Sequence, residues 1–374
     1  MVPNLRFNNA PYKEYNLYEF ATRITRKNKD NVSNLPLTIS AQYGLVDQVS
    51  FFNKTVASKD MSGYYLLKNG EFAYNKSYSN DYPWGAIKRL DLYDMGCLST
   101  LYICFKTNDN IVNSNYLVHY FESSKWHKQV ADIAGEGARN HGLLNIAVNA
   151  FFNTKHAVPT IENQIKIAGF LDLIEERIQT QIKIIDTLSS QKKQIRNLIF
   201  KDIHKNANCC IQDYVIYEQP QKYIVHSTDY LSYGKDYTPV LTANQSFILG
   251  YTLEKDGIYE KGDCIIFDDF TNENKYVDFP FKVKSSALKI LQTKEGLMLK
   301  FFYEYLQFLN FESTDHKRHY LSEVAVTDIS VPNLKEQTFV CKIFTSFDNK
   351  LKNEEALLEK YRLQKQFLLN NLFI

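Results

Sequence analysis

Two long stretches of the sequence, residues 159–200 and 332–373, repeat each other without a gap. Subtracting 173 from the numbers of the second stretch places Gln337 on Gln164, and both stretches begin with a proline. Proline is tolerated at the start of a helix but not inside one, and neither stretch contains a second proline. Because an internal repeat organises the whole fold, each stretch is predicted to form one helix of roughly 60 Å.

Both stretches carry an apolar seam whose members are separated alternately by three and four residues. Such a seam keeps one face of a helix apolar and requires a partner helix in a left-handed coiled coil. The seam residues are Leu171, Ile174, Ile178, Ile185, Leu188 and Ile195 in the first stretch, and Phe347, Leu351, Leu358, Tyr361 and Leu368 in the second.

Polar residues interrupt the two seams at matching positions, and Lys192 in the first corresponds to Lys365 in the second. A parallel pair in register would place these two lysines against each other, which their like charges disfavour. An antiparallel pair places Lys192 near Leu351, where its stem can pack and its ammonium can reach water. We therefore predict two antiparallel helices within one chain. The alternative is two separate amphipathic helices, each lying on its own globular domain.

Short β-like runs precede both long helices and repeat as well. The β-branched and aromatic runs between residues 35 and 105 predict a small antiparallel sheet or barrel, and the segment from Thr238 repeats their order. Asn69–Gly70 predicts a tight turn between two strands. Helices are expected at residues 111–133 and 297–311, and a strand at residues 143–152.

The predicted fold class is therefore α+β, with two β-rich modules and two long helices that form an antiparallel, pseudo-twofold coiled coil within the chain. The predicted domains are a first recognition module at residues 1–157, a first spacer helix at 158–203, a second module at 204–330 and a second spacer helix at 331–374.

Composition excludes several classes of protein. The net charge of +2 is nearly neutral, so charge alone does not point to nucleic acid. The six cysteines form no CxxC pair and no metal-like group with histidine. No apolar run approaches about 18 residues and the start lacks an apolar signal core, so we expect a cytoplasmic protein without a membrane contact.

The residue patterns of catalysis are missing from the sequence. It contains no GxxxxGK[ST] phosphate-binding loop, and its eight histidines are scattered. Asp268 and Asp269 are expected in a solvated turn rather than at a metal, because no histidine or third acid stands at ligand spacing. We therefore predict a binding protein with no catalytic residue, no metal and no cofactor of its own.

Two unlike modules on an antiparallel helix pair suit a ligand with twofold symmetry, and duplex DNA is the prime example. The helices would set the distance between two half-sites, and each module would read one. Asn, Gln and Arg side chains bind base edges, whereas lysines hold phosphates. The candidate base readers, which follow matched strands or lie in matched polar loops of the two modules, are Gln42, Tyr43, Arg139, Asn140, His141, Asn244, Gln245, His316, Lys317, Arg318 and His319. The further candidate DNA-binding residues are Lys76, Ser77, Lys88, Arg89 and Lys235.

Over essentially its full length, the chain resembles the specificity subunit of type I restriction–modification systems. The segments that carry the resemblance are VPNLRF, LTISAQYGLV, NGEFAYNKS, VPTIENQIKIAGFLDLIEERI, QKKQIRNLIF, VPNLKEQ and QKQFLLNNLF. The helix boundaries are its most specific part. Asn163 and Lys335 depart from the family, which commonly has acidic residues at the helix starts.

The resemblance implies a non-catalytic subunit that reads a bipartite, asymmetric DNA target. Its partners would be double-stranded DNA, two modification subunits that methylate adenine, and restriction subunits that cut DNA. S-adenosylmethionine, ATP and Mg²⁺ would then be bound by those partner subunits. The alternative is a non-catalytic coiled-coil scaffold whose two β-rich modules bind proteins or glycans, and an enzyme with an unrecognised site is a third reading.

Overall fold

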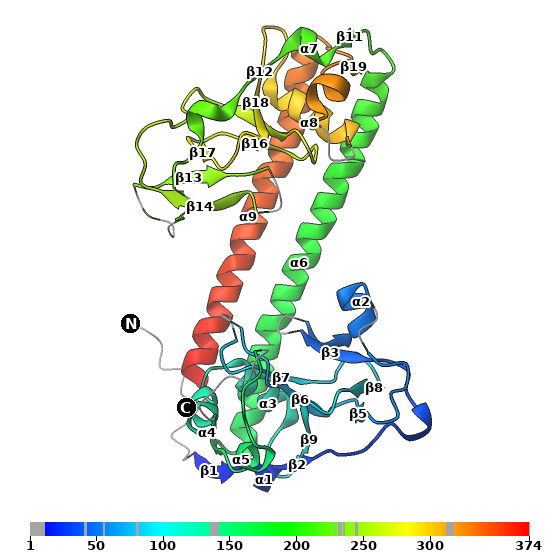
Figure 1. The fold of residues 1–374 in the computed structure, drawn as a ribbon, viewed down its shortest axis with the longest axis vertical. Coiled ribbons are helices and arrows are strands. Elements are labelled where there is room, and N and C mark those ends of the chain that lie inside the picture. Colours follow the sequence, from blue (N-terminus) through cyan, green and yellow to red (C-terminus); the bar gives the residue numbers. More distant parts are fainter. Residues whose placement is uncertain are drawn as a thin grey trace. The chain divides into compact units, whose positions relative to one another are not determined.

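The computed structural model describes residues 12–40, 43–54, 57–79, 82–134, 142–227, 229–230, 234, 236–243, 246–311 and 318–373. The chain divides into two compact units. Unit 1 comprises Met1–Gln181 and Leu357–Ile374, and unit 2 comprises Ile182–Ala356. Each unit therefore contains one β-rich module together with one part of each long helix (Figure 1).

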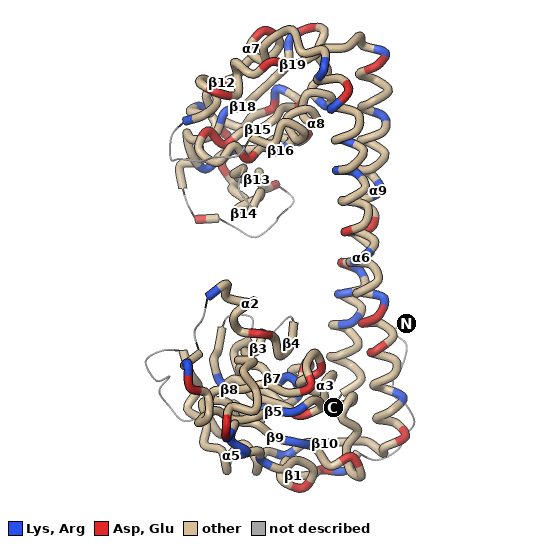
Figure 2. Tube along the Cα trace, turned by 90° about the vertical axis from the view of Figure 1, so that its right-hand side faces the viewer, with Lys and Arg blue, Asp and Glu red and all other residues tan. Residues whose placement is uncertain are grey.

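The two long helices are α6 (Ile161–His204) and α9 (Leu334–Leu372), of 44 and 39 residues. Every predicted seam residue is buried or half-buried. Charged residues of both signs are spread along both helices (Figure 2). The prediction of two long helices with an apolar seam is thus confirmed.

In unit 2 the two helices run antiparallel. The ammonium of Lys192 on α6 lies 2.5 Å from Asp348 on α9, and the ring of Phe200, further along α6, lies 6.2 Å from that of Phe344, earlier on α9. The predicted direction is therefore confirmed. The ammonium of Lys192 is held by ion pairs to Asp348 and to Glu304, which lies on α8 (Leu299–Leu309), and this pairing was not predicted from the sequence.

In unit 1 the start of α6 and the end of α9 pack on the same module helix. This helix is α3 (Ser114–Glu122), whose Tyr116 and Tyr120 rings lie 5.3 Å and 5.7 Å from the ring of Phe373. Lys365 of α9 binds Glu175 of α6 at 2.7 Å. The end of one helix therefore accompanies the start of the other, which is again the antiparallel direction.

The module of unit 1 consists of short antiparallel strands with small helices. Its four-stranded sheet has the order β2 (Ala21–Arg23), β9 (Ile103–Thr107), β6 (Phe72–Asn75) and β7 (Ala86–Arg89). Three strand pairs complete it: β1 (Lys13–Asn16) with β10 (Lys155–Val158), β3 (Leu37–Ser40) with β4 (Gly44–Asp47), and β5 (Tyr65–Lys68) with β8 (Met95–Leu98). Its other helices are α1 (Leu17–Phe20), the 3₁₀ helix Lys29–Asn31, α2 (Gln48–Phe52), α4 (His127–Ile133) and α5 (Val148–Phe152).

Two local predictions for this module need correction. The tight turn is present, with Gly70 at a φ of +81°, but its flanking strands β5 and β6 pair with other strands rather than with each other. Residues 143–152 were expected to form a strand, and they end in the helix α5 instead. Both corrections concern short segments whose partners are distant in the sequence.

The module of unit 2 repeats this organisation. Its sheet has the order β12 (Val215–Glu218), β18 (Leu288–Thr293), β15 (Cys264–Asp268) and β16 (Asn274–Val277). A second sheet contains β14 (Ile248–Thr252), β13 (Thr238–Leu241) and β17 (Lys282–Val283), and β11 (Cys209–Cys210) pairs with β19 (Asp328–Ile329). The remaining helical elements are α7 (Ile211–Tyr214), the 3₁₀ helix Pro220–Tyr223 and the π-helical turn Tyr320–Val324.

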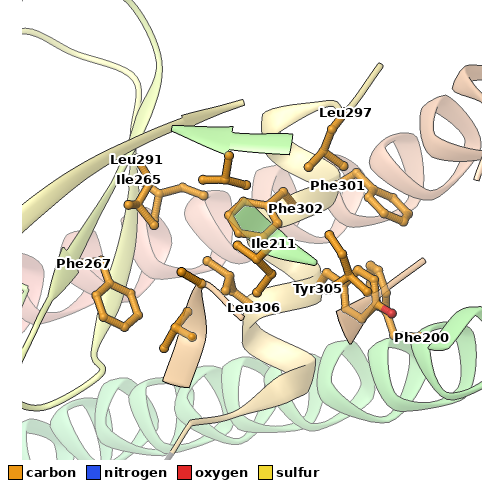
Figure 3. Close-up of a cluster of buried hydrophobic side chains, with 14 of the residues drawn as sticks. Phe200, Ile211, Ile265, Phe267, Leu291, Leu297, Phe301, Phe302, Tyr305 and Leu306 are labelled. Carbon is orange, nitrogen blue, oxygen red and sulfur yellow. The ribbon is translucent and has the colours of Figure 1, made fainter. Parts of the chain in front are cut away.

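Helix α8 supplies the aromatic core of unit 2 (Figure 3). Phe301, Phe302 and Tyr305 are fully buried, at the spacing that keeps side chains on one helical face. They pack against the sheet residue Ile265 and against Phe200 of α6, whose ring lies 4.9 Å from that of Tyr305. Burial of each such side chain contributes about 1.5–3 kcal/mol, so α8 fixes this module to the long helices.

The start of each long helix is tied to its module by a buried glutamine. In unit 1 the amide of Gln164 donates to the carbonyl of Pro159 (2.8 Å) and to that of Ile111 (3.3 Å), and it accepts from the Asn113 N–H (2.7 Å). The Gln164 side chain thus bonds to Pro159, to Ile111 and to Asn113, which is the residue that caps α3. The long helix and the module helix of unit 1 therefore begin at a common hydrogen-bonded point.

Gln337 does the same in unit 2. It donates to the carbonyls of Pro332 (2.7 Å) and Gly296 (2.8 Å), and it accepts from the N–H of Met298 (2.8 Å), the residue that caps α8. The glutamines that coincide in the sequence repeat therefore make equivalent bonds.

Candidate nucleic-acid interface

The structure describes fewer than half of the predicted DNA-binding residues. Those that lie outside the described residues are Gln42, Arg139, Asn140, His141, Lys235, Asn244, Gln245, His316 and Lys317. Their role stays a prediction, as does that of the residues considered next.

Three of the described candidates lie on surface loops of the first module. Tyr43 follows β3 and is 63% exposed, with its N–H bound to Ser40 Oγ at 3.1 Å. Ser77 is exposed beyond β6, and its N–H donates to Asn75 Oδ1 at 3.0 Å. The carbonyl of the half-buried Lys76 accepts from the N–H of Leu144 at 2.9 Å. Hydrogen bonds therefore fix the backbone of these loops near their predicted contact residues.

Lys88 and Arg89 of β7 instead connect the sheet to α3. Lys88 binds Glu122 at 3.2 Å. Arg89 binds Asp91 at 2.6 Å and donates to Ser114 Oγ at 2.8 Å and Asn115 Oδ1 at 2.7 Å. Since acidic and polar partners within unit 1 already hold both cations, the structure supports a positioning role for them.

Arg318 and His319 are adjacent in the second module but have different environments. The ring of His319 is buried, with Nδ1 3.0 Å from Glu323. The side chain of Arg318 is 61% exposed, and its guanidinium lies 5.8 Å from the centre of the Phe270 ring and approaches Asp269 to 4.0 Å. An exposed guanidinium held above an aromatic face suits contact with a base or a phosphate. Of the two, Arg318 is the residue that the structure offers to a ligand.

The acidic pair beside this arginine is buried, contrary to the prediction of a solvated turn. Asp268 Oδ1 accepts from the N–H groups of Phe270 (2.9 Å) and Thr271 (3.0 Å), so it caps the turn that ends β15. Asp269 lies 3.2 Å from the ammonium of the equally buried Lys289. These bonds account for both carboxylates without a metal.

Asp269 also fixes the chain that follows Arg318. Its carbonyl accepts from the His319 N–H (2.9 Å) and its Oδ1 accepts from the Tyr320 N–H (2.9 Å). The sequence reasoning missed this role. The sequence offers one sign of this role: Asp269 follows an apolar strand, and a basic run, His316–His319, lies in the same module.

A half-buried charge cluster joins the module of unit 1 to both long helices. Lys365 of α9 binds Glu122 of α3 at 2.9 Å and Glu175 of α6 at 2.7 Å. Burial raises the pKa of Glu122, but His119, Lys88 and Lys365 together bring that pKa well below its usual value. The pKa of Lys365 is raised, because the two carboxylates outweigh its burial. The cluster is therefore ionised at neutral pH.

Unit 2 contains an equivalent cluster around Lys192, the repeat counterpart of Lys365. Lys192 lies 3.2 Å from Glu304 of α8 and 2.5 Å from Asp348 of α9. Glu304 is fully buried and also binds Arg196 of α6 at 2.8 Å. Burial raises the pKa of Asp348, but Lys192 and Lys300 bring it below its usual value. Each module is thus clamped to both helices by a seam lysine.

One group of side chains has the composition of a metal site. His226, Glu254 and Asp256 offer ligand atoms that lie within 4.8 Å of one another. However, the buried ammonium of Lys282 lies 2.6 Å from Glu254 and neutralises it. A cation at this place would have to displace a paired lysine, so the group does not fit a metal.

Comparison with known proteins finds specificity subunits that are similar to part of this sequence or to its fold. The chain is 48% identical over 123 residues to the specificity subunit of the Escherichia coli type I restriction enzymes EcoR124I and EcoR124II, a match that covers 31% of this chain and 30% of that relative. The matched part thus spans less than a third of the curated relative. No protein-family model matches the sequence.

Two solved structures share the fold over the whole chain. The S subunit of a type I restriction–modification system from M. genitalium has a TM-score of 0.58 and 15% identity, with coverage of 100% of this chain and 99% of that one. A chain from a structure of type I restriction–modification complex assembly has a TM-score of 0.54 and 13% identity, with 96% of each chain covered. The resemblance and fold class inferred from the sequence are therefore confirmed. Among the described residues, no helix combines the length and apolarity needed to cross a membrane.

Proposed function

We propose that this chain, which has the fold of type I restriction–modification specificity subunits, is a non-catalytic DNA sequence-recognition subunit. Each module would read one half of a bipartite, asymmetric duplex target. The antiparallel helices α6 and α9 would act as the spacer between the half-sites. Because the two modules differ in sequence, the two half-sites would differ as well.

The observation that carries this proposal is that equivalent residues fix each module to the same two helices. Gln164 and Gln337 tie the helix starts to their modules, and Lys365 and Lys192 clamp the modules to the seam. A reader fixed in this way presents its loops at a defined angle to a rigid helix. Such rigidity is needed if helix length is to select the spacing of two half-sites.

Partner subunits would supply the chemistry. The polar faces of α6 and α9, which carry charges of both signs (Figure 2), would dock two modification subunits that methylate adenine, and restriction subunits would join that assembly. S-adenosylmethionine, ATP and Mg²⁺ would be bound by those partners. The near-neutral charge of the chain fits this division, because the partners can add positive charge around the DNA.

A competition gel shift with the purified complex of this chain and its modification subunits tests the proposal. Methylation-motif sequencing of the source genome first identifies the split target. We expect the target duplex to bind at least about a thousandfold more tightly than a scrambled duplex at moderate salt. Equal binding of both duplexes would contradict the proposal and favour a scaffold that binds proteins or glycans. Methyl transfer or DNA cleavage by the isolated chain would contradict its non-catalytic role.

A further inference from the structure

In both modules, the turn that follows an inner strand of the sheet is hydrogen-bonded to the chain that leaves the basic candidate loop. In unit 1 this strand is β6, and the N–H of Tyr78 donates to the carbonyl of Gly142 at 3.0 Å. The carbonyl of Lys76 accepts from the N–H of Leu144 at 2.9 Å. Gly142 directly follows the candidates Arg139–His141. Candidates from distant parts of the sequence are therefore joined at one place.

The equivalent junction of unit 2 follows β15, which has the same place in its sheet as β6. The carbonyl of Asp269 accepts from the N–H of His319, and its Oδ1 accepts from the N–H of Tyr320, both at 2.9 Å. His319 directly follows Arg318 in the basic run. Two modules with different sequences therefore share a hydrogen-bonded junction between a turn and a basic loop. The shared junction indicates that the turn and the loop act as one reading element.

The orientation of Arg318 in this element favours a base edge. Its side chain is 61% exposed, and the nitrogen that approaches Asp269, at 4.0 Å, is Nε. The guanidinium also lies 5.8 Å from the centre of the Phe270 ring. Its two terminal nitrogens make no hydrogen bond to the described residues. A partly restrained guanidinium with two unused donors at its exposed end matches a planar edge that offers two acceptors.

We propose that Arg318 reads a guanine in the half-site of the second module, by donating from its terminal nitrogens to N7 and O6 of that base. This inference rests on the proposed function. Both acceptors lie in the major groove, which admits a two-stranded ribbon such as the hairpin of β15 and β16. Phe270 acts as a positioning residue, because its ring restrains the guanidinium and reduces the conformational entropy that Arg318 loses on binding.

Replacement of guanine by 7-deazaguanine tests the contact without a change in the protein. The analogue keeps its base pairing but lacks the N7 acceptor. In the purified complex with modification subunits, each guanine of the split target, on either strand, is replaced in turn. We expect at least one replacement to lower the affinity about fivefold or more, because a good bidentate contact discriminates between bases by about 5- to 150-fold.

Three variants then identify the guanine that Arg318 contacts. Arg318→Ala should bind the target about tenfold or more weakly, and 7-deazaguanine should lose its effect at one position while it keeps its effect at the others. Arg318→Lys keeps the charge but not the planar fork, so it should lose target affinity and still bind scrambled duplex as the unsubstituted complex does. Phe270→Leu should weaken target binding about two- to fivefold and reduce the effect of 7-deazaguanine at the same position.

Lys284→Ala is the matched control. It removes an exposed cation from the same module, so it separates the loss of a positive charge from the loss of a base contact. We expect this variant to keep the effect of 7-deazaguanine at every position where the unsubstituted complex shows one.

The outcomes separate the two proposals. If the target is bound specifically but no 7-deazaguanine replacement matters, or each one that matters still matters in Arg318→Ala, this inference is wrong while the proposed function stands. Target binding by Arg318→Lys that equals that of the unsubstituted complex would indicate a phosphate contact and lead to the same conclusion. An unchanged effect of 7-deazaguanine in Phe270→Leu would exclude the positioning role. If the unsubstituted complex does not distinguish target from scrambled duplex, the proposed function itself fails.

Discussion

Replacement of Gln337 by leucine removes the hydrogen bonds that fix the second module to the start of α9. Leucine has a similar volume but cannot bond, so the Met298 N–H and the carbonyls of Gly296 and Pro332 lose their partner. Each group that is left buried and unsatisfied costs about 1–3 kcal/mol. Because water can reach part of this junction once it loosens, we expect the free energy of unfolding of unit 2 to fall by about 3–5 kcal/mol. Gln164→Leu should do the same to unit 1.

The two tryptophans make the effect on one unit measurable. The sequence contains only Trp84 and Trp126, and both lie in unit 1. Urea unfolding followed by tryptophan fluorescence therefore reports unit 1, whereas far-UV circular dichroism reports both units. With a slope of about 1–3 kcal/mol per molar urea, we expect Gln164→Leu to lower the fluorescence midpoint by roughly 1–5 M.

Exposed glutamines on the same helix provide matched controls. Gln179→Leu in unit 1 and Gln194→Leu in unit 2 change the same side chain at exposed positions of α6, and surface substitutions usually stay within about 0.5 kcal/mol. The reasoning is refuted if Gln164→Leu is no more destabilising than Gln179→Leu. In that case the equivalent hydrogen bonds of the two units would not be what fixes the modules.

Two further predictions concern unit 1. Burial lowers the pKa of His156 from 6.5 to about 4. As the pH falls, the unfolded state therefore binds the proton before the folded state does. The contribution of the neutral His156 to the free energy of unfolding is present in full above pH 6.5 and falls by about 1.4 kcal/mol per pH unit down to pH 4. Urea unfolding at pH 7.5 and pH 5 measures this loss of stability. His156→Gln should make the loss smaller, and a variant whose stability falls with pH as steeply as that of the unsubstituted protein would contradict the prediction. Lys365→Met leaves Glu122 and Glu175 without their shared cation. Because Glu175 is 37% exposed, we expect the free energy of unfolding of unit 1 to fall by about 2 kcal/mol rather than by the 3–5 kcal/mol that a fully buried pair would cost. A midpoint within error of the unsubstituted protein would show that the cluster does not clamp the module.

The long helices could be predicted from the sequence because their signal is local and repeated. Seam residues recur at helical spacing, and the equivalence of Gln164 and Gln337 is visible in the repeat itself. The function of these glutamines was not visible, because their partners Ile111 and Gly296 belong to loops tens of residues away. A repeat thus shows which positions are equivalent, whereas the structure is needed to show what each position binds.

Long-range pairing explains the errors. The turn at Gly70 was predicted from its dipeptide, but β5 and β6 pair with strands that follow later, and a turn does not specify those partners. Likewise, the prediction for Lys192 considered only α9 as the element that packs against this part of α6. Helix α8 brings the buried Glu304 to the same place, and no spacing within either long helix could reveal it.

The described DNA-binding candidates divide according to what holds them, and this division has a consequence for specificity. Lys88 and Arg89 are bonded to α3, which is itself clamped to the long helices, so we expect a change at either to alter the position of the module. Tyr43, Ser77 and Arg318 are exposed. The N–H groups of Tyr43 and Ser77 bond to nearby side chains, and the backbone after Arg318 is held by Asp269 of the β15 turn. Substitutions on these loops leave the helix clamps intact. If each module reads a half-site as proposed, substitutions on these loops should alter the target while the spacing between half-sites and the folding of the unit are unchanged.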